Sequence, residues 1–286
     1  MIKRQLSSYA RAPVMGAAFG LLLVLGSIVI SAHGFLIFFS LEGLIIVVGG
    51  VMAVAFMSFP ASDVHKALRA IWAMFKESSV TREDLRSDIT NILKWARLVK
   101  EKGMRELEAN VGKSGIDDSF VRYGLNMVVS EYTPEEVRSM METAADACYE
   151  RDSIPVEILD AMASHGPAFG MVGTLVGMVT TLCHLDSDTS NIGSNLAVAF
   201  LATLYGVISA RMVYMPAASK LRQEVEKSRF RNQLITEGLV MLVNNKTPMH
   251  VQDRLNSFLR PENHNYFNIF GESARIYKKF PFLQVD

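Results

Sequence analysis

The chain has 286 residues, of which half are hydrophobic and 20% are charged, and its formal net charge is zero. The mean hydropathy of +0.21 favours a membrane protein, and the balanced charge gives no argument for a nucleic-acid-binding protein or for an acidic substrate. The two cysteines, Cys148 and Cys183, lie far apart in the sequence, so they match no metal-binding spacing and are not expected to form a disulfide.

The first apolar region, Ala12–Ser62, holds a single charged residue, Glu42. About 20 apolar residues cross the hydrocarbon core of a bilayer, so this region accommodates two transmembrane helices. We expect them near Pro13–Ser31 and near Gly43–Phe59, with Pro60 ending the second. Glu42 would then lie at a helix N-terminus, where the dipole favours an anion, and an interfacial cap is a simpler interpretation of it than a buried functional carboxylate.

Residues 63–160 differ in kind, because apolar residues recur at three- and four-residue spacing among many charges. This spacing predicts soluble amphipathic helices. One helix is expected to begin at Thr133–Glu136, where a proline follows the threonine and two acidic side chains lie at the positive end of the helix. We interpret this block as a helical cytoplasmic domain.

Two further apolar spans follow, Ala163–Cys183 and Leu196–Ala218. Lysines and arginines precede the first span and follow the second and fourth, whereas the two turns on the opposite side have none, so the positive-inside rule places both termini in the cytoplasm. The predicted fold is an all-α integral membrane protein with four transmembrane helices. Its predicted parts are a cytoplasmic N-terminus (1–12), helices 1 and 2 (13–59), a cytoplasmic helical domain (60–162), helices 3 and 4 (163–218) and a cytoplasmic C-terminal helix and tail (219–286).

The third and fourth spans each carry a stripe of small residues. Glycines in the third span recur at spacings of four, three and four, which places them on one helix face: Gly166, Gly170, Gly173 and Gly177. The fourth span has a similar face: Ala199, Thr203, Gly206 and Ala210. Such stripes let transmembrane helices approach closely, and close packing alone accounts for both. A phosphate-binding loop is not indicated, because no Lys-Ser or Lys-Thr follows the glycines.

Two threonines and two prolines lie beside these stripes. A threonine in a transmembrane helix commonly bonds the carbonyl four residues earlier, but Thr174 and Thr203 lie mid-span, where small neighbours leave room for water or an ion. Pro167 and Pro216, near the cytoplasmic ends, each free a backbone carbonyl and permit local bending. These hydroxyls and freed carbonyls are the polar groups expected along one side of an ion path through the membrane.

The central part of each predicted span lacks Asp, Glu, Lys and Arg. Arg211 comes late enough in the fourth span to snorkel to the cytoplasmic surface, and His165 at the mouth of the third is interpreted as a hydrogen-bonded interfacial residue. Proton and cation pathways ordinarily need an intramembrane ionisable group. If this protein conducts ions, the titrating group must therefore come from another chain.

Five stretches together carry a family resemblance. They are "GPAFGMVGTLVGMV" in the third span, "SLEGLIIVVGG" at 40–50, "DSFVRYGLNMVVSEYTPEEVRSMME" at 118–142, "AFLATLYGVISARMVYMPAASKL" at 199–221 and "RLNSFLRPE" at 254–262. With four spans and a large loop between the second and third, the chain resembles the MotA/PomA flagellar stator subunits of the MotA/TolQ/ExbB superfamily.

The resemblance implies an assembly in the bacterial inner membrane. A subunits of this family form a ring, resembling a pentamer, around a dimer of MotB/PomB-like B subunits. Each B subunit supplies one transmembrane helix with an essential aspartate and a peptidoglycan-binding domain. Ion binding at that aspartate drives the ring, and the cytoplasmic loop pushes the rotor protein FliG. The implied protein is not an enzyme, binds lipid but no nucleic acid, and has no cofactor beyond the transported H+ or Na+.

Carried over residue by residue, the family's channel threonines fall on Thr174 and Thr203, and its two mechanically important prolines fall on Pro167 and Pro216. Its rotor-facing pair, usually arginine and glutamate, falls on Lys100 and Glu108. Lysine keeps the charge but loses the planar fork of arginine, so Arg97 or Arg105 could share the role. A solvated helix face remains the simpler interpretation of any one of these four residues taken alone.

Alternative functions and the choice of ion remain open at this point. A TolQ/ExbB-like energiser of outer-membrane processes is the main alternative, but three spans are usual there, and four favour the stator. A non-conducting membrane scaffold is a weaker alternative. Sodium-driven relatives typically carry two adjacent threonines in the fourth span, where this chain has Ala202-Thr203. Because a sodium ion needs several oxygen ligands, the missing hydroxyl favours protons.

Overall fold

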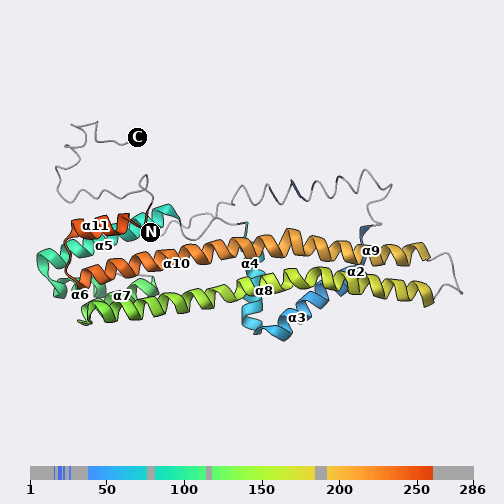
Figure 1. The fold of residues 1–286 in the computed structure, drawn as a ribbon, viewed down its shortest axis with the longest axis horizontal. Coiled ribbons are helices and arrows are strands. Elements are labelled where there is room, and N and C mark those ends of the chain that lie inside the picture. Colours follow the sequence, from blue (N-terminus) through green and yellow to red (C-terminus); the bar gives the residue numbers. More distant parts are fainter. Residues whose placement is uncertain are drawn as a thin grey trace. The chain divides into compact units, whose positions relative to one another are not determined.

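The computed structural model describes residues 38–75, 81–113, 118–183 and 192–259, besides isolated positions between 16 and 26. All regular structure in these residues is helical, which confirms the all-α prediction (Figure 1). The chain divides into two compact units, which we call the membrane unit (Met1–Ser79 and Arg151–Val225) and the charged unit (Val80–Glu150 and Glu226–Asp286). The predicted first span, Pro13–Ser31, and the end of the C-terminal tail lie outside the described ranges.

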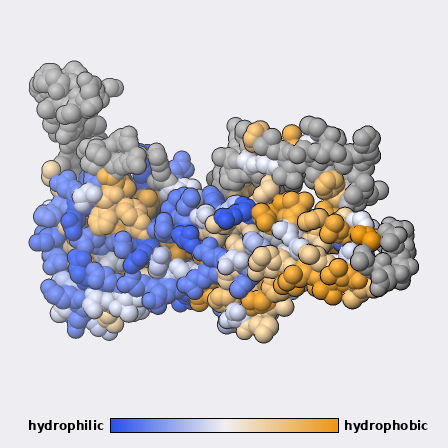
Figure 2. Space-filling model, turned by 45° about the vertical axis from the view of Figure 1, so that its right-hand side comes forward, coloured by the Kyte–Doolittle hydropathy of each residue, from blue (hydrophilic) through white to orange (hydrophobic). Residues whose placement is uncertain are grey.

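Among the residues that the structure describes, three helical runs are long and apolar enough to cross a membrane: Leu41–Ser58, Pro134–Cys183 and Ile192–Val243. The first run matches the predicted second span to within one residue at its end, and the other two contain the predicted third and fourth spans. Figure 2 shows hydrophobic side chains gathered over the membrane unit. Much of the surface of the charged unit is hydrophilic in the same view. The chain is therefore a helical membrane protein, as predicted.

The first described run of the membrane unit begins with a capped turn. Ser40 accepts a hydrogen bond from the Gly43 N–H at 3.2 Å through its hydroxyl, and Glu42 lies in the first turn, as expected of an interfacial acid. The run ends before Pro60, as predicted, and an amphipathic helix follows it. The run consists of α2 (Leu41–Leu44), the π-helical segment η2 (Ile45–Gly49) and α3 (Gly50–Ser58), and the amphipathic helix after it is α4 (Ala61–Ala73).

Helix α8 (Pro134–Cys183) begins where the sequence predicts, because Thr133 and Glu136 form a reciprocal cap. It contains both Pro155 and Pro167 and continues through the predicted boundary at residues 162 and 163. The predicted third span is thus the second half of a 50-residue helix. Hydropathy predicts which part of a helix lies in the lipid, but it does not predict the residue at which the helix begins.

The fourth span is divided by a widened turn. Helix α9 (Ile192–Ile208) leads into the π-helical segment η4 (Ser209–Tyr214), and α10 (Met215–Val243) follows. The Met215 N–H donates to the carbonyl of Ala210, five residues earlier. Pro216 has no N–H, and its ring clashes with the carbonyl four residues before it in a regular helix, so the wider turn accommodates the proline.

The charged unit surrounds the second half of α10. Residues 234–242 are buried on every side, with Leu234, Ile235 and Leu239 at no more than 1% exposure. The helices packed into this unit are α5 (Arg82–Lys102), α6 (Met104–Lys113), α7 (Ser119–Val129), the start of α8, and α11 (Pro248–Asn256). Residues 226–259, which the sequence prediction assigned to a separate C-terminal part, therefore belong to the same compact unit as most of the central domain, because the aliphatic side chains of this stretch need burial.

Candidate functional site

The glycine stripe of α8 lies against α9 at backbone contact distance. A Cβ atom added to Gly206 would lie 2.5 Å from the carbonyl oxygen of Gly166, and one added to Gly173 would lie 2.4 Å from the Ala202 Cβ. Gly170 and Gly177 make similarly close contacts, so all four glycines of the stripe face this seam. Larger side chains would separate the two helices.

The predicted threonine pair meets in the seam between α8 and α9. Thr174 Oγ1 donates towards the carbonyls of Gly170 at 3.2 Å and Ala199 at 3.1 Å. Thr203 Oγ1 lies 3.2 Å from the same Gly170 carbonyl, and the two hydroxyls bond to each other. Thr174 therefore joins two helices as well as bonding its own i−4 carbonyl. Each hydroxyl has two lone pairs, so the half-buried pair can still accept hydrogen bonds from a further group.

Ala202 is the meeting point of three helices. It is 0% exposed, with Gly173 of α8 on one side and Gly43 of α2 on another. A Cβ on Gly43 would lie 3.5 Å from the Ala202 Cβ. A threonine at position 202 would need two more heavy atoms in this space, so the seam as built has no room for a second fourth-span hydroxyl.

Tyr205 anchors the segment that precedes α2. Its hydroxyl donates to the Phe38 carbonyl at 2.6 Å and accepts from the Ser40 N–H at 2.8 Å. The tyrosine hydroxyl thus satisfies two backbone polar groups, which are costly to leave unpaired when they are buried. The sequence signal for this contact is the position of Tyr205 inside an apolar span, because a tyrosine there usually needs a partner for its hydroxyl.

The exposed face of α8 in the membrane unit is apolar. Its large hydrophobic side chains between 47 and 66% exposed are Met171, Leu175, Val176, Met178, Val179 and Leu182. Arg211 is exposed on η4, with its guanidinium 3.1 Å from the Met215 sulfur. No cluster of His, Cys, Asp and Glu suited to a metal ion occurs among the residues that the structure describes.

The four predicted rotor-facing residues lie in the charged unit, around a helix junction. Lys100 is in the last turn of α5, and Arg105 and Glu108 are on α6, all three exposed, while Arg97 is half-buried. Gly103 separates the two helices with φ +83°, a conformation that favours glycine. The structure thus groups these residues at one helix junction, whereas the threonine pair belongs to the membrane unit.

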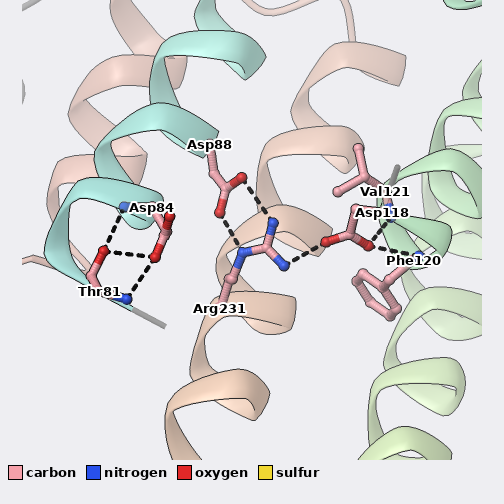
Figure 3. A network of polar contacts seen from close by, with 7 residues as sticks. All are labelled: Thr81, Asp84, Asp88, Asp118, Phe120, Val121 and Arg231. Atoms are coloured by element: carbon pink, nitrogen blue, oxygen red, sulfur yellow. Dashed lines mark hydrogen bonds and ion pairs between the residues drawn. The ribbon is translucent and has the colours of Figure 1, made fainter. Parts of the chain in front are cut away.

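Two charge triads in the charged unit escaped the sequence analysis. Arg231 of α10 bonds Asp88 and Asp118 (Figure 3). Glu237, also on α10, bonds Arg138 at 2.8 Å and Arg254 at 3.0 Å. Asp88 and Asp118 lie more than 100 positions from Arg231, and Arg254 lies 17 positions from Glu237, so no helical spacing predicts these contacts.

The fold and the seam define a class, that of helical membrane proteins with a hydroxyl pair between two closely packed spans. A family model described as the MotA/TolQ/ExbB proton channel family matches residues 113–234. YtxD of Bacillus subtilis, called an uncharacterized protein, is 31% identical over 241 residues, covering 81% of this chain and 86% of YtxD. The chain belongs to the MotA/TolQ/ExbB proton channel family.

Other relatives confirm the resemblance to MotA/PomA subunits. Motility protein A of Bacillus subtilis is 26% identical, covering 82% of this chain and 86% of the relative. Chemotaxis protein PomA of Vibrio alginolyticus is 29% identical, covering 78% and 85%. The family is one of channel subunits rather than enzymes.

Two solved structures share the fold. The structure of C. jejuni MotAB aligns with a TM-score of 0.78 at 20% identity, covering 90% of this chain and 99% of that one. The flagellar MotAB stator complex from Bacillus subtilis aligns with a TM-score of 0.75 at 23% identity, covering 89% and 96%.

Proposed function

We propose that this chain is the A-type subunit of a flagellar stator, which converts ion flow across the bacterial inner membrane into torque on the rotor. The observation that carries the proposal is the pair Thr174 and Thr203, which lies in the seam between two spans whose central parts contain no Asp, Glu, Lys or Arg. Similarity to motility proteins over most of the chain supports it.

The ionisable group of this pathway comes from a partner. The predicted spans have no mid-membrane carboxylate, so a single-span B subunit with a membrane aspartate completes the path. When that aspartate is protonated, its O–H can donate to the free lone pairs of the threonine pair. The solved complexes that share this fold are named for both an A and a B component.

Further copies of this chain and lipid cover the rest of the membrane unit. The exposed apolar face of α8 is what a ring around B helices requires, and we propose a pentamer with both termini in the cytoplasm. Lys100 and Glu108, with Arg97 and Arg105 nearby, would face a FliG-like rotor protein. No cofactor is needed besides the transported ion.

A set of isosteric threonine changes tests the polar path. Thr174→Val and Thr203→Val remove hydroxyls from the pair, so both should lower ion flow and swimming speed in cells that also make the B subunit. Thr181→Val is the matched control, because the Thr181 hydroxyl donates to its own Gly177 carbonyl at 2.7 Å. Normal swimming of the Thr174→Val, Thr203→Val double variant at normal membrane levels would exclude the pair from the path.

The proposed ion is the proton. A sodium ion leaving water needs several oxygens to replace its hydration shell, and Ala202 occupies the place of one of them. The packing around Ala202 leaves no room to restore that hydroxyl without moving α2 or α8. Swimming speed should therefore stay constant as external sodium is varied at fixed proton-motive force. A steep sodium dependence, blocked by a sodium-channel inhibitor, would show that the ion is sodium.

A further inference from the structure

Arg231 joins three helices of the charged unit through one guanidinium group (Figure 3). Its Nε and Nη2 atoms donate to the two carboxylate oxygens of Asp88 on α5, at 2.5 and 3.0 Å. Its Nη1 atom donates to Asp118 at 2.5 Å. Asp118 in turn accepts hydrogen bonds from the N–H groups of Phe120 and Val121, at 2.9 and 3.2 Å, and so caps α7. Only a planar, forked donor can make this set of contacts.

All three side chains of this network are mostly buried and charged. Their exposed fractions are 20% for Arg231, 14% for Asp88 and 28% for Asp118. Hydrogen bonds to Asp88 raise the pKa of Arg231. Burial opposes ionisation of Asp118, but hydrogen bonds from Arg231 and from the first turn of α7 outweigh it and lower the pKa of Asp118. Loss of the guanidinium would leave two carboxylates close together without their cation.

Helix α10 carries Arg231 and continues from the fourth span into the charged unit. It follows η4 directly, so it belongs to the same helical run as Thr203 of the threonine pair. Its second half is the central helix of the charged unit. Apolar contacts around a central helix are not directional and permit sliding or rotation, whereas a bidentate ion pair holds one register. The Arg231–Asp88 pair is therefore a directional contact between α10 and α5.

Asp88 and Lys100 are carried by the same helix. They are 12 positions apart, which corresponds to about 18 Å of α-helix. The start of α5 is itself fixed by a reciprocal cap, in which Thr81 and Asp84 bond each other's side chains and N–H groups. A force applied by Arg231 at Asp88 is thus delivered to the whole of α5 and to the junction with α6.

We propose that Arg231 is a positioning residue that locks α5 and α7 to α10, so that movement of the fourth-span helix reaches the rotor-facing residues. This inference rests on the proposed function, because it assumes that Lys100 and Glu108 contact a rotor. Without this lock, ions still flow through the membrane unit, but their flow no longer produces torque.

The test uses the full chain with its B subunit and compares three variants. Arg231→Met removes the guanidinium. The triple variant Arg231→Met, Asp88→Asn, Asp118→Asn also neutralises the stranded carboxylates, and asparagine still caps α7. Arg229→Ala is the matched control, because Arg229 lies two residues earlier on α10 and pairs with Asp146 of α8 at 3.0 Å, where the side chains are 41 and 60% exposed.

Three measurements separate a lock from a structural role. Hydrogen exchange of residues 82–113 should become about tenfold faster or more in Arg231→Met and return towards normal in the triple variant. Ion flow of the triple variant should equal that of the parent, whereas its torque in tethered cells should be lost. Arg229→Ala should keep both ion flow and torque. Normal torque in the triple variant would overturn the proposal, as would unchanged exchange in Arg231→Met.

One further variant separates failure of this inference from failure of the proposed function. The double charge reversal Lys100→Glu, Glu108→Lys leaves the Arg231 network intact. If it abolishes swimming while the triple variant swims normally, only the lock is rejected. If it swims normally itself, the rotor contact at Lys100 and Glu108 is rejected, and with it the proposal that the Arg231 lock acts through these two residues.

Discussion

At the scale of single residues, the contact between α8 and α9 depends on the absence of side chains. Gly206→Ala would place a Cβ 2.5 Å from the Gly166 carbonyl oxygen, and backbone cannot yield cheaply. We expect a loss of about 1–3 kcal/mol in stability. Gly49→Ala is the control, since nothing lies within 4 Å of its new Cβ, and it should gain about 0.5–1 kcal/mol in helix propensity. Thermal unfolding in detergent measures both; equal melting temperatures would refute the close contact.

The rotor-facing residues are also tested singly and together. Exposed charges interact weakly, at about 0–1 kcal/mol for each pair. Reversal of Lys100 or Glu108 alone should therefore impair swimming partially, and reversal of both should impair it more. Membrane levels and ion flow should be unchanged, because both side chains are exposed and belong to the charged unit. A double variant that swims at parental speed would contradict a rotor contact and show that these residues only form a solvated helix face.

At the scale of helices, Tyr205 determines how the chain enters α2. Tyr205→Phe would remove the hydroxyl and leave the Phe38 carbonyl and the Ser40 N–H without their partner. Each unsatisfied group costs about 1–3 kcal/mol. We expect a lower melting temperature and faster hydrogen exchange in residues 41–49. Tyr132→Phe is a suitable control, because Tyr132 is exposed. No change in Tyr205→Phe would mean that water or lipid headgroups satisfy the two groups equally well.

How far each helix could be predicted depends on how local its signals are. Thr133–Glu136 fixes the start of α8 through contacts within four residues, and the glycine spacing in the third span identifies its packing face. The continuity of α8 through Pro155 has no such local signal, because a proline inside a helical pattern ordinarily favours a break or a kink. The Arg231 contacts join residues more than 100 positions apart, and the Thr174–Thr203 bond needs the exact register of two helices. Neither leaves a periodic pattern in the sequence.

At the scale of the whole molecule, acid should weaken the charged unit first. Burial opposes ionisation of Asp118 and Glu237, but hydrogen bonds from their arginine partners outweigh it and lower the pKa of both carboxyls below the ordinary values of 3.8 and 4.5. Their contribution to stability is therefore complete above those values and is lost as pH falls through the lowered pKa. Melting temperatures of the full chain should be flat from pH 7 to about 5 and fall below about 4.

Neutral variants provide the control for this acid dependence. Asp118→Asn keeps a cap for α7, and Glu237→Gln keeps a similar volume, but neither side chain can gain a proton. Both should be less stable than the parent at neutral pH and should lose less stability between about pH 5 and 3. An acid slope that both variants share with the parent would assign the acid effect to other carboxyls.

The central claim is that this chain provides a hydroxyl-lined seam but not the group that titrates. The predicted spans contain no mid-membrane carboxylate, and the described membrane unit holds Thr174 and Thr203 as an intact pair. The most direct measurement is proton flux into vesicles that contain the purified chain, alone and with its single-span B subunit. Flux should appear only with the B subunit and should disappear when its membrane aspartate is changed to asparagine. Selective flux through the chain alone would contradict the account.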